Sequence, residues 1–413
     1  MRIERLEKAW SRRRQPGEGL AEDVRGILEE VRRDGDAAVL RLTARFDRAE
    51  LRPDELRVEP RELEASLGVL EPDVLRGLRA AIANVRRVAE EQVGGPAAVE
   101  LEAGQRVELL EVPVRRAGIY VPAGRAAYPS TVVMAAVTGR AAGVEQLAVC
   151  APPGPRGGAH PVILAACVLC EVTEVYRMGG AQAVAALAYG TESVPAVDVI
   201  VGPGNAYVQE AKRQLVGQVG IDGIAGPSEL VVVAGEDGDP ELIALDLLAQ
   251  AEHGEESPLW LLCPDRTLLE EVVAAVERLV PERPSVADAE LQAVLVDDLY
   301  EAVRFAEEIA PEHLELVGAD AEGLAERVSR AGCVFVGAGA GTAFGDYVAG
   351  SNHVLPTGGA ARFQGALSPA TFRRRMARVT LPGEAPARLA PLGAAIARAE
   401  GFPVHAESME RRA

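Results

Sequence analysis

The chain has 413 residues, more than the ~100–200 typical of one domain, so we expect two or more domains. Apolar residues make up 48% and aromatic residues only 4%, so Ala, Val and Leu must form most of the cores. The formal net charge of −19 argues against a nucleic-acid partner, because phosphate binding needs basic surfaces, although the same charge fits a simple aid to solubility.

Neither a secretory signal nor a membrane span is expected, because the first residues are charged and no window approaches ~18 consecutive apolar residues. The 5 cysteines are an odd number spread thinly along the chain, which is not a disulfide framework. Cys167 and Cys170 have metal-ligand spacing, but they adjoin the apolar run 163–169 without a second pair, which indicates a buried helix face. Cysteine usage of this kind predicts a cytoplasmic protein.

Residues 1 to about 110 alternate charged and apolar positions at helical spacing, and we expect amphipathic helices there. From 118 to 234, short apolar runs suited to buried strands alternate with helix-like segments that follow turns rich in Gly and Pro. The expected strands are Gln146–Ala151, Glu174–Met178, Val197–Val201 and Leu230–Ala234. This alternation predicts a parallel sheet covered by helices, with ligands at the carboxyl ends of the strands.

Two glycine turns, Gly179–Gln182 and Gly202–Asn205, each follow an expected strand and open an expected helix. Free N–H groups at a helix start favour an anion such as a pyrophosphate. Neither turn completes a G-x-G-x-x-G fingerprint, so a nucleotide site and an ordinary tight turn fit the pattern equally well. A third run, Gly337–Gly341, looks similar, but we expect loop rather than helix after it.

A second α/β section is expected from about 235 to 365. In it, Asp239 caps a predicted helix that runs to His253 and stops at Gly254. Gln250 and His253 are three residues apart and would share one face at the helix end, so both could reach one ligand. Such a pair is more often surface decoration, and metal ligation is the alternative.

Three later segments also contain histidine. Glu312 and His313 follow a proline turn and suit an acid/base pair, although a capping glutamate beside a solvated histidine is an equal alternative. Asp346 and His353 lie in a loop rich in Gly and Asn, of a kind that often binds a ligand.

The last histidine, His405, stands five residues after Glu400 in a largely helical tail. A free tail is the default expectation there. One glutamine, two histidines and one aspartate form a plausible zinc set, although sequence spacing does not show that they converge. The set is Gln250, His253, Asp346 and His405.

Taken in order, these segments resemble the histidinol dehydrogenase family over roughly residues 20–410. The matching stretches are Gly118-Ile-Tyr120-Val-Pro-Ala-Gly, Gly179-Gly-Ala-Gln182-Ala, Gly202-Pro-Gly-Asn205-Ala-Tyr-Val-Gln-Glu-Ala-Lys-Arg, Ala225-Gly-Pro-Ser228-Glu, Gln250-Ala-Glu-His253, Ala310-Pro-Glu-His313-Leu-Glu and Gly345-Asp346-Tyr-Val-Ala-Gly-Ser-Asn-His353-Val-Leu-Pro-Thr-Gly-Gly. Glu400 and His405 keep the family's C-terminal five-residue interval.

The resemblance implies a role for each matched residue. Gln250, His253 and Asp346 would bind one zinc ion per subunit, completed by His405 from the partner subunit of a homodimer. The acid/base residues would be Glu312 and His313. Ser228, His353 and Glu400 would line the substrate pocket together with the zinc ligands and the acid/base pair, and NAD would contact Tyr120, Gln182 and Asn205.

The implied α/β fold has two interleaved, incomplete Rossmann-like domains with small N- and C-terminal helical extensions. The implied parts are a helical extension (1–15), a first domain (16–119 plus 234–367), a second domain (120–233) and a dimerisation tail (368–413). The implied reaction is the four-electron, NAD-dependent oxidation of L-histidinol through L-histidinaldehyde to L-histidine, the last steps of histidine biosynthesis. Alternatives are a zinc and NAD dehydrogenase of another polyol or amino alcohol, a zinc hydrolase with this fold, and an inactive metal- or nucleotide-binding protein.

Overall fold

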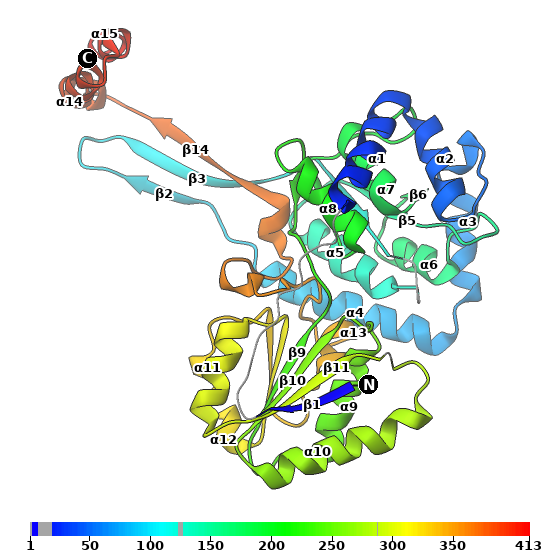
Figure 1. Ribbon diagram of the computed structural model, residues 1–413. Coiled ribbons are helices and arrows are strands. Elements are labelled where there is room, and N and C mark those ends of the chain that lie inside the picture. The colour runs from blue at the N-terminus through cyan, green and yellow to red at the C-terminus, as the bar shows by residue number, and fades with distance from the viewer. Residues whose placement is uncertain (1, 7–18, 123–126, 287) are drawn as a thin grey trace.

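A computed structural model describes residues 2–6, 19–122, 127–286 and 288–413. Two parallel sheets, each with its own helices, form two units, and a small antiparallel sheet leads out to a pair of helices at the C-terminal end (Figure 1). The last two residues of the 118–124 motif and most of the expected extension 1–15 lie outside the described residues.

The five-stranded sheet has the order β6-β5-β4-β7-β8, and every pairing in it is parallel. Its strands are β4 (Arg116–Tyr120), β5 (Gln146–Ala151), β6 (Glu174–Arg177), β7 (Val199–Val201) and β8 (Gly220–Ile221). The expected runs at 146, 174 and 197 are confirmed as strands, because strands buried on both faces read as nearly continuous apolar runs. The order reverses between β4 and β7, which is the Rossmann-like switch point.

Helices α5 (Pro129–Ala141), α6 (Pro161–Leu169), α7 (Gly180–Tyr189) and α8 (Ala206–Leu215) follow these strands. Four N-terminal helices pack on them: α1 (Leu20–Asp34), α2 (Asp36–Phe46), α3 (Pro60–Ser66) and α4 (Pro72–Glu91). Helix α1 buries Val24, Ile27, Leu28 and Val31, one stripe at helical spacing. These four helices therefore share cores with the five-stranded sheet, whereas the sequence grouped residues 16–119 with 234–367.

The six-stranded sheet has the parallel order β1-β11-β10-β9-β12-β13. Its strands are β1 (Arg2–Leu6), β9 (Leu230–Ala234), β10 (Pro258–Cys263), β11 (Glu290–Leu295), β12 (His313–Val317) and β13 (Cys333–Val336). Its helices are α9 (Pro240–Ala251), α10 (Arg266–Leu279), α11 (Leu299–Ile309), α12 (Ala319–Glu322) and α13 (Thr342–Tyr347). Because β1 joins this sheet before the chain builds the other one, the two units are interleaved.

Three expectations of helix in residues 1–110 are wrong. Arg2–Leu6 is strand β1, which pairs with β11, and β2 (Ala97–Glu100) and β3 (Arg106–Pro113) form an antiparallel sheet with β14 (Arg373–Thr380). Beyond β14, α14 (Ala385–Ala399) and α15 (Pro403–Glu410) complete an arm that extends away from both units (Figure 1). For β1 and β3, pairing with strands more than 200 residues away overrides the local helical pattern, and β2 pairs in turn with β3.

Two local details also differ from expectation. A short helix, α13, follows Gly337–Gly341 where loop was expected, because the carboxylate of Glu315 accepts the N–H of Thr342 at 2.8 Å and caps that helix start. Helix α9 begins with the expected Asp239 cap but ends at Ala251, so His253 lies in the turn beyond it. None of the helices in the described ranges combines the length and apolarity of a membrane crossing.

The six 3-10 helices of the described residues lie in connections: Pro53–Glu55, Leu67–Val69, Val280–Glu282, Ala325–Arg327, Ala360–Arg362 and Pro369–Phe372.

Candidate active site

A cavity of about 420 Å³ lies between the carboxyl edge of the five-stranded sheet and the amino edge of the six-stranded sheet. Seven of the residues singled out in the sequence line it: Asn205, Ser228, His253, Glu312, His313, Asp346 and His353. They come from segments up to 148 positions apart in sequence (205 to 353), so the fold supplies the convergence that sequence spacing did not show.

Chain direction explains why these groups gather at the amino edge of the six-stranded sheet. Helices α9 and α11 run antiparallel to the strands that they connect, so their C-terminal ends return to that edge. The end of α9 brings Gln250 and His253 there, and the end of α11 brings Glu312. Helix α11 stops at Ala310, whose φ of +51° turns the chain into β12. Ser228 arrives at the same edge, just before β9.

Glu312 is buried and held by three neighbours in a chain of hydrogen bonds. Its Oε2 accepts the hydroxyl of Ser228 at 2.5 Å and the N–H of Glu229 at 3.0 Å. Ser228 in turn accepts the Nε2 of Gln250 at 2.6 Å. Burial raises the pKa of Glu312 to about 8, since the surroundings disfavour the charged form more than these donors favour it.

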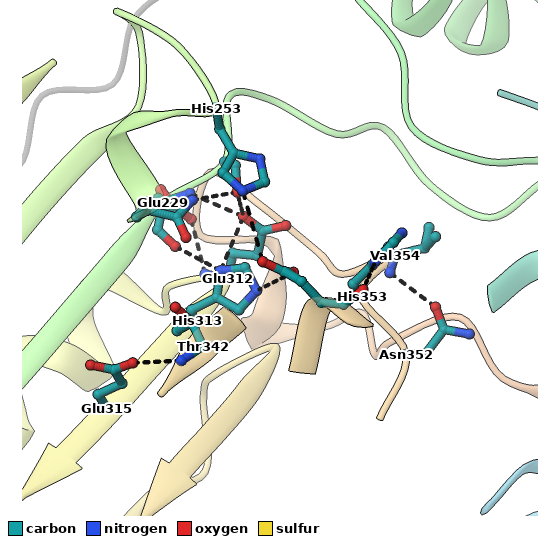
Figure 2. Close-up of polar contacts among 12 residues, drawn as sticks. Glu229, His253, Glu312, His313, Glu315, Thr342, Asn352, His353 and Val354 are labelled. Atoms are coloured by element: carbon teal, nitrogen blue, oxygen red, sulfur yellow. Dashed lines mark hydrogen bonds and ion pairs between the residues drawn. The ribbon is translucent and has the colours of Figure 1, made fainter. Parts of the chain in front are cut away.

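His313 is buried beside Glu312, with its two ring nitrogens in different surroundings (Figure 2). Nδ1 donates to the backbone carbonyl of Glu229 at 3.2 Å, because a carbonyl oxygen only accepts. Nε2 faces Oδ1 of Asp346 at 3.9 Å. Burial lowers the pKa of His313 to about 4, so the ring is neutral and Nε2 carries a free lone pair. A neutral imidazole held in one tautomer suits a general base.

Asp346 lies near the end of α13, close to His253, His313 and His353. Its Oδ2 lies 3.8 Å from Nε2 of His253, and its backbone carbonyl accepts Nδ1 of His353 at 2.9 Å. Burial raises the pKa of Asp346, whereas the three neighbouring histidines, His253, His313 and His353, lower it. The histidines together have the larger effect, so the pKa lies below its usual value. The carboxylate is therefore charged and has oxygens directed at histidine nitrogens.

Part of the predicted zinc set fits a metal ion. Oε1 of Gln250 is buried without a hydrogen-bond partner in the described part of the chain, because Nε2 of the same amide is committed to Ser228. The 3.8 Å between His253 and Asp346 is close to the ~3.3–3.5 Å that separates two ligands of one tetrahedral zinc ion. Among the described residues, no three His, Cys, Asp or Glu side chains gather as a metal site.

The remaining tail residues, Glu400 and His405, lie on the arm, whose helices extend away from both sheets (Figure 1), and neither residue lines the cavity. Glu400 is the C-cap of α14, and His405 lies in α15, where its ring packs at 5.3 Å from that of Phe402. Both side chains are exposed. Within one subunit, the fold therefore does not bring them to the other candidates.

The candidate cofactor residues lie at the end of β4 or after β6 and β7, at the carboxyl edge that the sequence predicted. Both glycine turns open helices, α7 and α8, and Asn205 caps α8 by accepting the N–H of Val208 at 3.1 Å. The hydroxyl of Tyr120 accepts the N–H of Gly180 at 3.1 Å. Tyr120 and Gln182 are buried and do not line the cavity, and Nε2 of Gln182 has no hydrogen-bond partner among the described residues.

Sequence reasoning missed two further residues beside this cavity. Glu229 binds His313 through its backbone, and its carboxylate accepts the N–H of Gly358 at 2.8 Å. Thr131 lies with its hydroxyl 3.4 Å from Nε2 of His353. The available signal for Glu229 was its position directly after Ser228 in a matching motif, whereas Thr131 had none.

A Rossmann-like sheet with a helix-opening turn, facing a neutral histidine and a buried carboxyl group, is the arrangement of an NAD-dependent oxidoreductase. The family model described as histidinol dehydrogenase matches residues 10–413. The chain belongs to the histidinol dehydrogenase family, enzymes of histidine biosynthesis.

Individual relatives agree with the family model. The chain is 46% identical over 398 residues to a histidinol dehydrogenase of Cereibacter sphaeroides, covering 94% of this chain and 91% of that protein. It is 43% identical over 406 residues to one of Zymomonas mobilis subsp. mobilis, covering 97% and 94%. Its fold matches the crystal structure of histidinol dehydrogenase from Elizabethkingia anophelis with a TM-score of 0.93, at 30% identity and over 100% and 98% of the two chains.

Proposed function

We propose that this protein oxidises L-histidinol through L-histidinaldehyde to L-histidine in one active site. One histidinol, two NAD⁺ and one water become one histidine, two NADH and three protons. The observation that carries this proposal is the buried Glu312–His313 pair on the wall of the cavity, where Nε2 of His313 faces Asp346 at 3.9 Å. This base and carboxyl group lie next to the candidate zinc ligands Gln250, His253 and Asp346. The arrangement suits an alcohol substrate that is held through its own imidazole and amine nitrogens.

The zinc ion of this proposal would be held by Gln250, His253 and Asp346, with His405 of the partner subunit as the fourth ligand. When bound, zinc supplies an anchor for the imidazole and amine nitrogens of the substrate, and NAD supplies the hydride acceptor. Support comes from the unpartnered Oε1 of Gln250 and from the mixed nitrogen and oxygen donors. Zinc loading should be one ion per subunit.

His313 takes the alcohol proton on Nε2 while the carbinol carbon loses its hydride. Its Nδ1–H stays on the carbonyl of Glu229, which holds the ring in place and stabilises the imidazolium that forms. Because its pKa is lowered, His313 is neutral before the reaction and releases the proton readily afterwards.

Glu312 acts in the second half of the reaction. Once it is ionised, above its raised pKa of about 8, its carboxylate removes a proton from the water that adds to the aldehyde, which gives the hydrate that loses the second hydride. Ser228 and the N–H of Glu229 orient the carboxylate from one side. Ser228 and His353, which line the cavity, and Glu400 of the partner subunit complete the substrate pocket in this proposal.

The proposed assembly is a homodimer in which the arm of each subunit reaches the cavity of the other. Apolar side chains are exposed along the arm, as expected for a surface that a partner covers. They include Val99, Leu109, Met376, Val379, Leu392, Ile396 and Val404. A free arm would leave Glu400 and His405 without a function, whereas exchange between subunits completes both sites.

The proposed NAD contacts are Tyr120, Gln182 and Asn205, at the carboxyl edge of the five-stranded sheet. We also propose a revised division of the chain, in which α1–α4 belong with the 120–233 domain because they share its cores. A reducing compartment, the cytoplasm, is proposed because all five cysteines lie within the described residues and none forms a disulfide.

The test is the NADH yield of zinc-loaded protein with excess NAD and limiting L-histidinol. Two NADH per histidinol, lost with a chelator and restored by zinc, are expected. One NADH per histidinol would mean that the second oxidation does not occur. No NADH with histidinol, but turnover of another amino alcohol or polyol, would overturn the proposed substrate.

A further inference from the structure

A buried ion pair lies behind the Gly202–Asn205 turn, outside the residues to which any role has been assigned. Lys212 is 1% exposed and Asp222 is 7% exposed at their side chains, and Nζ of the lysine meets Oδ1 of the aspartate at 2.7 Å. Lys212 lies on α8, one to two turns after the Asn205 cap, and Asp222 directly follows β8. Both residues line the cavity.

The pair binds both backbone polar groups of Gly202, its N–H and its carbonyl. Nζ of Lys212 donates to the carbonyl of Gly202 at 2.5 Å, and Oδ2 of Asp222 accepts the N–H of Gly202 at 2.6 Å. With the ion pair itself, three short contacts close a ring around one residue of the turn. Charge-assisted hydrogen bonds of this kind constrain geometry more strongly than neutral ones.

The conformation that this ring holds is one that few residues adopt. Gly202 has a φ of +115°, and a Cβ at this position would lie 2.1 Å from the carbonyl oxygen of Tyr120. The turn is thus pressed against the end of β4 while it opens α8. A glycine in this position has many other conformations available, so external bonds are needed to select one.

The same aspartate also ties the turn to the opposite side of the cavity. Its backbone carbonyl accepts Nε2 of Gln364 at 2.7 Å, and Gln364 packs directly over Gly223. The loop that carries Gln364 donates the N–H of Gly358 to the carboxylate of Glu229, whose backbone carbonyl binds His313. The pair therefore links the proposed cofactor turn to the residues that orient the proposed base.

We propose that Lys212 and Asp222 are positioning residues that hold the Gly202–Asn205 turn in the shape that receives NAD. The inference rests on the proposed contact between this turn and NAD. A buried ion pair generally adds little net stability, so its value here lies in the geometry that it imposes. The two charges neutralise each other, and the effect on the cofactor is exerted through the turn.

The test is the double variant K212M/D222N, which removes both charges and leaves neither buried alone. We expect the KM for NAD to rise about ten-fold or more, equivalent to roughly 1.4 kcal/mol. The KM for histidinol, and kcat at saturating NAD, should stay within about two-fold. The dissociation constant of NADH, measured by fluorescence titration, should rise by the same factor as the KM for NAD.

The matched control is R116M/E174Q, another buried ion pair of the same domain. Arg116 and Glu174 begin β4 and β6, at the edge of the sheet that faces away from the cavity. We expect this control to lose about as much Tm as K212M/D222N does, while its KM for NAD stays unchanged. If the double variant matches the control in both quantities, the pair is merely structural and the inference is wrong.

Two further variants separate the possible failures. K212R keeps the positive charge but moves the donor atoms, so its NAD affinity should lie between those of wild type and the double variant. If the double variant does not fold, the KM for NAD of K212R provides the test instead. N205A tests the cofactor contact itself. If N205A raises the KM for NAD and the pair variants do not, only this inference fails; if none of them does, the proposed cofactor contact fails as well.

Discussion

The amide of Gln250 illustrates how one side chain can be oriented by its neighbours. Because Ser228 donates its only hydroxyl hydrogen to Glu312, it can only accept from Gln250, which must turn its Nε2 toward Ser228. Oε1 is then left buried and unpartnered in the described structure. A buried acceptor without a partner is costly, and a bound cation would satisfy it.

Removing this amide should therefore weaken zinc binding. We expect Gln250→Leu to lower zinc affinity by about 10- to 100-fold, measured by competition with a chelator rather than by activity. Gln292→Leu is the control. The side-chain amide of Gln292 is also buried, but its oxygen accepts the indole N–H of Trp260 on β10, and Gln292 does not line the cavity. Equal zinc affinity in wild type and Gln250→Leu would contradict the assignment of this ligand.

Replacing Glu312 by glutamine distinguishes the hydrogen bonds that its side chain accepts from its role in proton transfer. Glu312→Gln keeps an oxygen that can accept from Ser228 and Glu229 but removes the base. We expect oxidation of histidinaldehyde to fall by about 100-fold or more, and oxidation of histidinol by less than about ten-fold. NADH formation from each compound, supplied separately, measures the two halves. An equal loss in both would refute the division of labour between Glu312 and His313.

At the scale of elements, strand β12 connects the candidate base to helix α13. His313 and Glu315 are two positions apart and so lie on the same face of the strand. Glu315 caps the start of α13, whose last turn carries Asp346, and Gly341 before that helix packs tightly against the carboxylate of Asp246 on α9. The buried Glu315 and the half-buried Asp246 thus both lie against the start of the short helix that presents Asp346.

Burial raises the pKa of Glu315 to about 8 and that of Asp246 to about 6. Both values exceed those of an unfolded chain, so the folded state binds more protons and loses stability as the pH rises from about 5 through 8. We expect Glu315→Gln to flatten this dependence and to raise the free energy of unfolding at pH 8 by about 1 kcal/mol or more. Denaturant unfolding at pH 5 and pH 8 measures it; parallel profiles for wild type and variant would contradict the burial effect.

The same elements show where local patterns suffice and where they do not. Strands β5 and β9 have the bounds that their apolar runs predicted, and Asp239 caps α9 as expected. The helix α13 was missed because its cap, Glu315, is 27 positions away in sequence. Strand β2 was missed because all of its residues are exposed, and β3 was missed because it is only half-buried and its partner β14 lies near the end of the chain.

At the scale of the whole molecule, the two sheets contribute opposite edges to one cavity. The five-stranded sheet offers its carboxyl edge, as Rossmann-like folds usually do, and the six-stranded sheet offers its amino edge. The expected rule of carboxyl ends thus holds for the candidate cofactor side only. The arm adds a third contribution in the proposed homodimer, since Glu400 and His405 lie on it and do not line the cavity of their own subunit.

Shared sites can be tested by mixing two variants that are each inactive. In a heterodimer of His405→Ala and His313→Ala subunits, one of the two sites has every proposed group intact. Random reassociation of equal amounts should therefore restore about one quarter of wild-type NADH formation from histidinol. Each variant mixed with itself is the control. No recovery after verified subunit exchange would show that His405 acts in its own subunit or not at all.

The sequence by itself determined the family, the α/β class, four of the buried strands and the residue types of the candidate site. These signals are local, because apolar runs, helix caps and short motifs are complete within a few positions. Only the tertiary structure decided that Ser228, Glu312 and His313 meet at an amino edge, that Glu229 orients the histidine, and that Lys212 and Asp222 enclose Gly202. Those contacts depend on chain direction and on pairing between distant segments, which no local pattern encodes.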